Sequence, residues 1–184
     1  MSTGALAAIV VLAVVVVVLA AVTASLLMRR RRLRERFGPE YERTVEGSGG
    51  RLAGERELRE RERRHDTLEI KPLPAAARER YVGEWRGVQE EFVDRPRDAV
   101  HDADRLVTSL MHERGYPTEG YEQQMKDLSV EHGSTLEHYR SAHEIEALST
   151  RQQATTEQLR GAMVHYRALF DELLSEGGRA QPAR

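Results

Sequence analysis

The sequence predicts an all-α membrane protein, in which an N-terminal transmembrane helix is followed by a charged spacer helix and then a small helical bundle. Three observations predict it: a 24-residue apolar run near the N-terminus, a cluster of arginines directly behind it, and apolar residues that recur every three or four positions further along. No segment alternates polar and apolar residues for long enough to suggest a strand. The net charge of −2 conceals a division of the chain into an uncharged N-terminal part and a highly charged remainder, because every charged side chain lies within residues 29–184. The division excludes an ordinary soluble protein, a multi-span transporter and a disulfide-stabilised secreted domain.

The apolar run covers residues 5–28, in which only Thr23 and Ser25 are not apolar. As a helix, this run reaches roughly 36 Å, which is enough to cross a hydrocarbon core of about 30 Å. A buried core helix is rarely apolar on every face over such a length. A signal peptide carries positive charge before a shorter apolar core of about 7–15 residues, whereas only residues 1–4 precede this run. We therefore expect a membrane-spanning helix over residues 5–28, with residues 1–4 outside the membrane.

A basic collar over residues 29–36 follows the run and sets the expected orientation. The positive-inside rule keeps such a cluster in the cytoplasm, so residues 29–184 are expected inside and the N-terminus outside. The collar could also bind anionic lipid headgroups, although a topology signal is sufficient to explain it. Residues 29–36 carry +5 and residues 37–184 carry −7, and an acidic domain argues against nucleic-acid binding. The arginines of the collar are Arg29, Arg30, Arg31, Arg32, Arg34 and Arg36.

Residues 37–73 are expected to form a flexible joint and a charged spacer helix. Four glycines within residues 46–54 are typical of a flexible linker. A phosphate-binding loop would need Gly-Lys-Ser/Thr after a strand, and neither is present. Residues 55–65 are almost all charged, which favours a solvated helix stabilised by its own i,i+4 ion pairs. The expected pairs are Glu55/Arg59, Glu57/Arg61 and Glu60/Arg64.

Residues 74–176 are expected to form a bundle of about five helices joined by short loops. Four apolar stripes at helical spacing predict it: Tyr81, Trp85, Val88 and Phe92; Val100, Ala103, Val107 and Leu110; Leu136, Tyr139 and His143; and Leu159, Met163, Tyr166, Leu169 or Phe170, and Leu173.

Helix boundaries within the bundle also have sequence signals. Pro74 and Pro96 suit the first turn of a helix, and Gly115 suits a helix C-terminus. The patterns over residues 134–137 and 155–158 fit the capping box. Gly177-Gly178 is expected to end the last helix, leaving residues 177–184 as a disordered tail.

The chain lacks the residues of a recognisable catalytic or cofactor site. Without cysteine there is no thiol nucleophile and no cysteine-based zinc site. Asp127, Ser129 and His132 could be arranged on paper as a nucleophile set, but Ser129 is interpreted more simply as a helix N-cap. A ligand groove among the aromatic side chains is a further alternative. Histidines are the best candidates for a metal site in a membrane-attached metal-binding or hydrolytic domain. The candidate ligands are His101, Asp104, His138 and His143.

Four segments stand out: LRERFGPEYERTV (33–45), ADRLVTSLMHERGYP (103–117), DLSVEHGSTLEHYRSAHEI (127–145) and TTEQLRGAMVHYRALFDELL (155–174). These segments resemble a family of uncharacterised bacterial single-pass membrane proteins that is common in actinobacteria. The resemblance extends over nearly the whole chain after the anchor, and implies a shared architecture, a bacterial plasma (inner) membrane and a cytoplasmic helical domain, with no particular mechanism. The sequence departs from the family where Gly133 replaces the usual proline after His132, and where Arg95 replaces an acidic residue before Pro96, which removes a good N-cap.

Together these features favour a non-enzymatic protein that tethers or scaffolds an unidentified protein partner at the membrane. No cofactor is expected. The expected partners are the lipid bilayer, anionic headgroups at the collar and a protein, with no nucleic acid. Small residues at Gly4 and Ala8 allow a homo-oligomer through close packing of the anchor.

Overall fold

The computed structural model describes the backbone of residues 3–175, together with the side chains from residue 11 onward. The described chain is all-α and contains no strand, as the sequence predicts. The predicted end of the last helix at Gly177-Gly178 and the tail 177–184 lie outside it. The helices, in order, are α1 (Thr3–Phe37), α2 (Pro39–Gly47), α3 (Arg51–His65), α4 (Ala75–Glu91), α5 (Pro96–Glu113), α6 (Tyr121–Leu128), α7 (Leu136–Thr150) and α8 (Thr156–Ser175).

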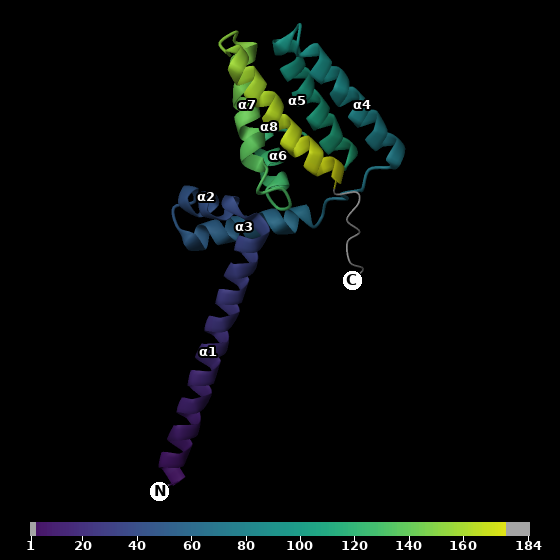
Figure 1. Ribbon diagram of the computed structural model, residues 1–184. Coiled ribbons are helices and arrows are strands. Elements are labelled where there is room, and N and C mark those ends of the chain that lie inside the picture. The colour runs from purple at the N-terminus through teal and green to yellow at the C-terminus, as the bar shows by residue number, and fades with distance from the viewer. Residues whose placement is uncertain (1–2, 176–184) are drawn as a thin grey trace.

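Helix α1 joins the apolar run and the basic collar in one continuous helix. The most apolar 18-residue window within Val11–Phe37 has a mean hydropathy of 2.9, and none of that window is buried inside the protein. The helix is long and apolar enough to span a membrane. In Figure 1 it extends as a rod away from the rest of the molecule, and only its C-terminal end contacts other helices.

Residues 37–73 differ from the prediction of a flexible joint and a solvated spacer, because helices α2 and α3 pack together as a hairpin. Gly49 and Gly50 have φ values of 72° and 148° and form the turn between the two helices. Gly54 lies so close to the backbone of Val45 that an added Cβ would be 2.7 Å from its Cα. The glycines therefore serve a tight turn and a close helix crossing. A run of glycines does not distinguish these uses from a flexible linker.

Helices α4–α8 form the predicted five-helix bundle. Helix α8 packs against α5 and α7, and α4 packs against α5 (Figure 1). Nearly every residue of the four predicted stripes is buried in one core, with Phe92 and His143 half-buried. Trp85 of α4 stacks on Phe170 of α8, with ring centroids 4.7 Å apart. The stripes therefore predicted the bundle correctly.

Several of the predicted boundaries are confirmed. Pro96 is the first residue of α5. Gly115, with φ 96°, follows α5, and the Gly115 and Tyr116 amides bond back to the carbonyls of His112 and Met111, which is the Schellman pattern. At the start of α8, Thr155 N donates to the Gln158 side chain and Gln158 N donates to the Thr155 hydroxyl, which is the predicted capping box.

Three other boundary predictions are wrong. Pro74 is the N-cap of α4 and does not lie in its first turn. The N-cap of α7 is Thr135, one residue after the first residue of the predicted capping box, and it makes no side-chain cap; the Glu137 carboxylate accepts from Arg43 and Arg140. Ser129 caps the C-terminus of α6, where its hydroxyl donates to the carbonyl of Lys126.

Candidate functional site

A second, smaller core joins the C-terminal end of α1 to the bundle. It contains Leu33 and Phe37 of α1, Tyr41 of α2, Leu58 of α3 and Val130 from the segment after α6. Phe37 and Leu58 are completely buried. Burying a large apolar side chain stabilises by about 1.5–3 kcal/mol, so the docking of α1 and the hairpin on the bundle is part of the fold.

Gly133 allows the backbone before α7 to pack closely against the backbone at the end of α1. A Cβ at this position would lie 2.3 Å from the carbonyl oxygen of Phe37 and 3.0 Å from its carbonyl carbon. Such distances are too short for any side chain unless the backbone moves. Gly133 is therefore the residue against which the C-terminal end of α1 packs.

Polar contacts connect α3 to the C-terminal end of α6. The Arg64 guanidinium donates to Asp127 at 2.9 Å, and Arg61 donates to the Ser129 hydroxyl at 3.3 Å. Asp127 is completely buried and also accepts from Gln123. A buried carboxylate needs such partners, because an unpaired buried charge costs several kcal/mol. Ser129 and Asp127 are thus structural partners of the hairpin and do not form a nucleophile set with His132.

A second ionic contact connects α2 to α7. Arg140 makes two hydrogen bonds to the Glu40 carboxylate, at 2.5 and 2.7 Å. Glu40 is only 4% exposed, so this pair is largely shielded from water. Arg43 of the same helix reaches Glu137 of α7 at 2.9 Å. Both helices of the hairpin are therefore attached to the bundle.

A chain of polar groups continues from α3 into the bundle, in which His65, Tyr116 and His132 are buried and the carboxylates of Glu131 and Glu172 are partly exposed. His65 Nε2 lies 3.7 Å from Glu131, whose other oxygen accepts from the Tyr116 hydroxyl at 3.1 Å. That hydroxyl is also 3.0 Å from Nε2 of His132, and Nδ1 of His132 is 2.9 Å from Glu172 of α8. Because a carboxylate accepts, the Nδ1 that faces Glu172 carries a proton. The hydrogen bond with His65, aided by Tyr116 and the charge of His132, lowers the pKa of Glu131 to about 2, more than its partial burial raises it, so the group is ionised at neutral pH.

The collar arginines divide into those used inside the protein and those left outside. Arg36 pairs with Glu62, and Arg34 pairs with Glu42 and lies over the Tyr41 ring. Arg32 is 3.7 Å from Glu62 but is largely exposed, as are Arg29 and Arg31, the latter paired with Glu35. Arg30 is half-buried beside Tyr41.

The four candidate metal ligands are not brought together. His143 Nδ1 lies 3.5 Å from Asp104, whereas His101 faces Glu146 at 3.3 Å. His138 pairs with His165 at 2.9 Å. Within the described residues no group of three or more His, Cys, Asp or Glu side chains could hold a metal ion.

Asp104 forms a small structural network in the bundle. It accepts from the Tyr166 hydroxyl at 2.9 Å and raises the pKa of His143, more than partial burial lowers it. Burial, reinforced by the Asp104 charge, raises the pKa of Tyr139 and Tyr166, so both phenols stay neutral. Tyr121 stacks on His143 with ring centroids 4.1 Å apart, so this histidine is a packed structural residue.

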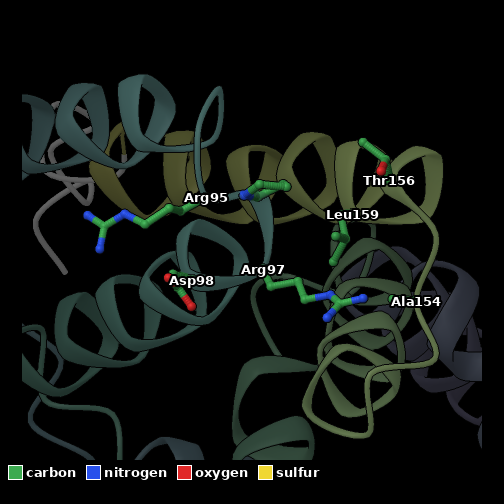
Figure 2. A pocket seen from close by; sticks show the side chains of 7 residues that line it. Arg95, Arg97, Asp98, Ala154, Thr156 and Leu159 are labelled. Carbon is green, nitrogen blue, oxygen red and sulfur yellow. The ribbon is translucent and has the colours of Figure 1, made fainter.

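An open pocket of about 410 Å³ lies between the start of α5 and the start of α8. In Figure 2 the side chain of Arg97 extends toward Ala154 and Leu159, whereas Arg95 points away from them. Arg95 has no side-chain cap to offer α5, and pairs instead with Glu91 at 2.8 Å. Figure 1 places this end of the bundle on the side opposite to α1. The lining residues are Arg95, Pro96, Arg97, Asp98, Ala154, Thr156 and Leu159.

Comparison with known proteins adds no identification, since no protein-family model, curated protein or solved structure matches the chain.

The sequence does not predict the residues that join α1, α2 and α3 to the bundle, because the local pattern around them is weak. Leu58 is the single strongly apolar residue within residues 55–65, and Arg61 and Arg64 have acidic neighbours four residues earlier. Only the Glu57–Arg61 pair of the three expected i,i+4 pairs forms. One pattern before α3 could have predicted part of the junction: Phe37, Tyr41 and Val45 recur at intervals of four, which is typical of one apolar face of a helix.

Proposed function

We propose that this chain is a non-enzymatic, single-pass membrane protein that holds its helical bundle in a fixed orientation at the membrane surface, where a protein partner recognises it. One observation carries the proposal: Phe37, at the end of the apolar helix, is completely buried in a core that includes Val130 of the bundle. A protein that only concentrates a domain at a membrane needs no more than a flexible linker. A docked anchor adds a defined direction and height.

The membrane is proposed to be the bacterial plasma membrane, with the N-terminus outside and the bundle in the cytoplasm. The charge distribution supports this orientation: residues 29–65 carry 13 arginines and 8 glutamates, whereas residues 66–184 carry a net charge of −7. The exposed collar residues Arg29, Arg31 and Arg32 are placed to contact anionic headgroups.

The membrane-distal end of the bundle is the surface we propose for the partner. It combines the open pocket with Val93, which is 80% exposed in the loop between α4 and α5. An exposed apolar side chain beside a pocket and the Arg97 guanidinium offers both apolar and polar contacts to a protein.

The experiment is photo-crosslinking in cells that express the full-length protein. A photoreactive residue at Val93 or Arg97 is expected to capture one defined protein. The same residue at Arg86, which is exposed on α4, is the matched control and is expected to capture much less of it. Equal capture at all three positions, or none at Val93 and Arg97, would contradict the proposed surface.

Membrane orientation is tested separately. The chain has no cysteine, so a single cysteine can be placed at Val93 and treated with a membrane-impermeant thiol reagent in whole cells. Protection in whole cells and labelling after lysis are expected. Labelling of intact cells would place the bundle outside.

A further inference from the structure

One face of α3 carries outward-pointing basic side chains that the junction does not use. Leu52, Arg56, Arg59 and Arg63 are separated by four, three and four residues and therefore share one face of the helix. Leu52 is 75% exposed and the Arg63 side chain 78% exposed, while Arg56 is also exposed. Arg59 is half-buried, with its Nε donating to the carbonyl of Glu55. We call these four residues the α3 stripe.

The α3 stripe faces away from the bundle. Gly54, buried against Val45 of α2, is nine residues before Arg63, and nine residues are two and a half helical turns. The stripe therefore lies on the side of α3 opposite α2, and α2 is the helix that bonds to α7 of the bundle.

Contacts with α1 give the direction in which the stripe points. Glu62 contacts Arg32 and Arg36 of α1, and Asp66 also reaches Arg36. Arg59 and Arg63 precede Glu62 and Asp66 by three residues, so they adjoin the flank of α3 that meets the anchor helix. Figure 1 shows α3 lying across α1, between the bundle and the free length of the anchor. The stripe thus points toward the side from which the apolar helix leaves the protein.

The height of α3 suits contact with lipid headgroups. Arg32 and Arg36, which Glu62 contacts, are four and eight residues beyond Met28, the last residue of the apolar run. These separations correspond to about 6 and 12 Å along the helix axis. The headgroup layer is roughly 5–8 Å thick on each side of the hydrocarbon core, and arginine side chains extend readily into it.

The acidic side chains of α3 mostly bond within the protein, whereas several of its arginines lie on the outward face. The helix carries six arginines and four glutamates. Glu55, Glu57 and Glu62 bond to Tyr41, Arg61 and Arg36 within the protein. Glu60 is the exposed acid, 3.5 Å from Arg63. The outward face is therefore basic overall, although the helix as a whole is nearly balanced.

We propose that the α3 stripe is a second membrane-contacting surface, on which α3 lies flat against anionic phospholipid headgroups, with Leu52 at the boundary of the acyl chains. The proposal rests on the proposed function, because it places the apolar part of α1 across the bilayer. Charge complementarity between the stripe and an anionic leaflet commits it to lipid. The collar and the stripe then hold α1 from two sides and fix how the bundle is tilted.

The test uses single cysteines in the full-length chain, which has none of its own, carrying a fluorophore and reconstituted in vesicles of equal parts phosphatidylglycerol and phosphatidylcholine. A nitroxide on the lipid headgroup is expected to quench a label at Leu52→Cys strongly. A label at Val93→Cys, which is 80% exposed at the far end of the bundle, is the matched control and is expected to stay bright. Quenching at Leu52→Cys that is no greater than at Val93→Cys overturns the inference, and the stripe would then contact a protein or water.

A third label separates this outcome from failure of the anchor. Val18→Cys lies within the apolar run and is expected to be quenched by a nitroxide in the middle of the acyl chain. If Val18→Cys is quenched but Leu52→Cys is not, the anchor stands and the stripe fails. If Val18→Cys escapes quenching, the proposed function fails as well.

Charge reversal tests the chemistry of the contact. Arg56→Glu/Arg63→Glu is expected to abolish headgroup quenching at Leu52→Cys. Each arginine near an anionic surface changes the ratio of membrane-bound to detached α3 about fivefold. The control reversal Arg86→Glu/Arg151→Glu, at exposed positions on the bundle, is expected to leave quenching unchanged. Vesicles of phosphatidylcholine alone are expected to reduce quenching in the unmodified stripe. Quenching that is indifferent to both the reversal and the lipid charge overturns the proposal.

Discussion

Replacement of Gly133 by alanine tests the junction between α1 and the bundle most sharply. The added Cβ would lie 2.3 Å from the Phe37 carbonyl oxygen and 3.3 Å from that of Ser129, whereas ordinary contact begins at 3.4 Å. The overlap with Phe37 is therefore about 1 Å. Phe37 is completely buried, so its backbone cannot move without disturbing the shared core. Overpacking of this kind costs typically about 1–3 kcal/mol.

A gain from reduced unfolded-state entropy offsets part of this cost. Gly→Ala stabilises by about 0.4–1 kcal/mol where the backbone conformation suits alanine, and the φ of Gly133 does not lie in the left-handed region. The net expectation is destabilisation by about 1–2 kcal/mol, which corresponds to a fall in Tm of roughly 2–8 °C for a chain of this size. The loss is expected to concentrate in the hairpin, where amide hydrogen exchange of α2 and α3 becomes faster than that of α5 and α8.

Gly161→Ala provides the matched control. Gly161 lies in α8 with nothing within 4 Å of an added Cβ, so alanine is expected to stabilise the helix by about 0.5–1 kcal/mol. The assay is thermal unfolding of the full chain in detergent micelles, followed by hydrogen exchange of each variant. If Gly133→Ala is as stable as Gly161→Ala, with unchanged exchange in the hairpin, the close packing of Phe37 on Gly133 is refuted.

The remaining predictions concern ionic groups and one cap. Arg140→Ala is expected to cost about 3–5 kcal/mol in unfolding free energy, because it leaves Glu40 buried without its partner, and a loss below 1 kcal/mol in denaturant titration would contradict this. The pKa of Glu131, about 2 in place of its ordinary 4.5, adds stability that is complete above pH 4.5 and is lost as the pH falls toward 2. Glu131→Gln is therefore expected to flatten the acid limb of stability against pH, and an unchanged limb would argue against the Glu131 ion pair. Arg95→Asp supplies the missing N-cap of α5 and is expected to raise unfolding free energy by about 0.5–1 kcal/mol, whereas no gain in Tm would show that the cap does not form.

The bundle could be predicted from sequence because its information is local. Tyr81, Trp85 and Val88 are neighbours on one helix face, and their spacing alone places them on the same side. Gly115 likewise has one conformational use at the end of a helix, which the structure confirms.

The junction could not be predicted in the same way because its partners are distant in sequence. Arg64 finds Asp127, 63 residues away, while an i,i+4 glutamate offers an equally plausible local partner. Gly54 and Gly133 owe their roles to backbone approaching from other helices, which no local pattern encodes. The four candidate metal ligands were predicted from spacing within single helices, but they are not brought together. Spacing within one helix does not determine which side chains face it from another helix.

The central claim is that the apolar helix is rigidly joined to the bundle. It is tested most directly by double electron–electron resonance between spin labels at Leu27→Cys on α1 and Val93→Cys at the far end of the bundle, in the full chain reconstituted in vesicles. Both positions are exposed, at 60% and 80%. A docked junction predicts one narrow distance distribution, as narrow as that of Val93→Cys with Val164→Cys within the bundle. A broad distribution for the first pair beside a narrow one for the second would show a flexible joint and contradict the account.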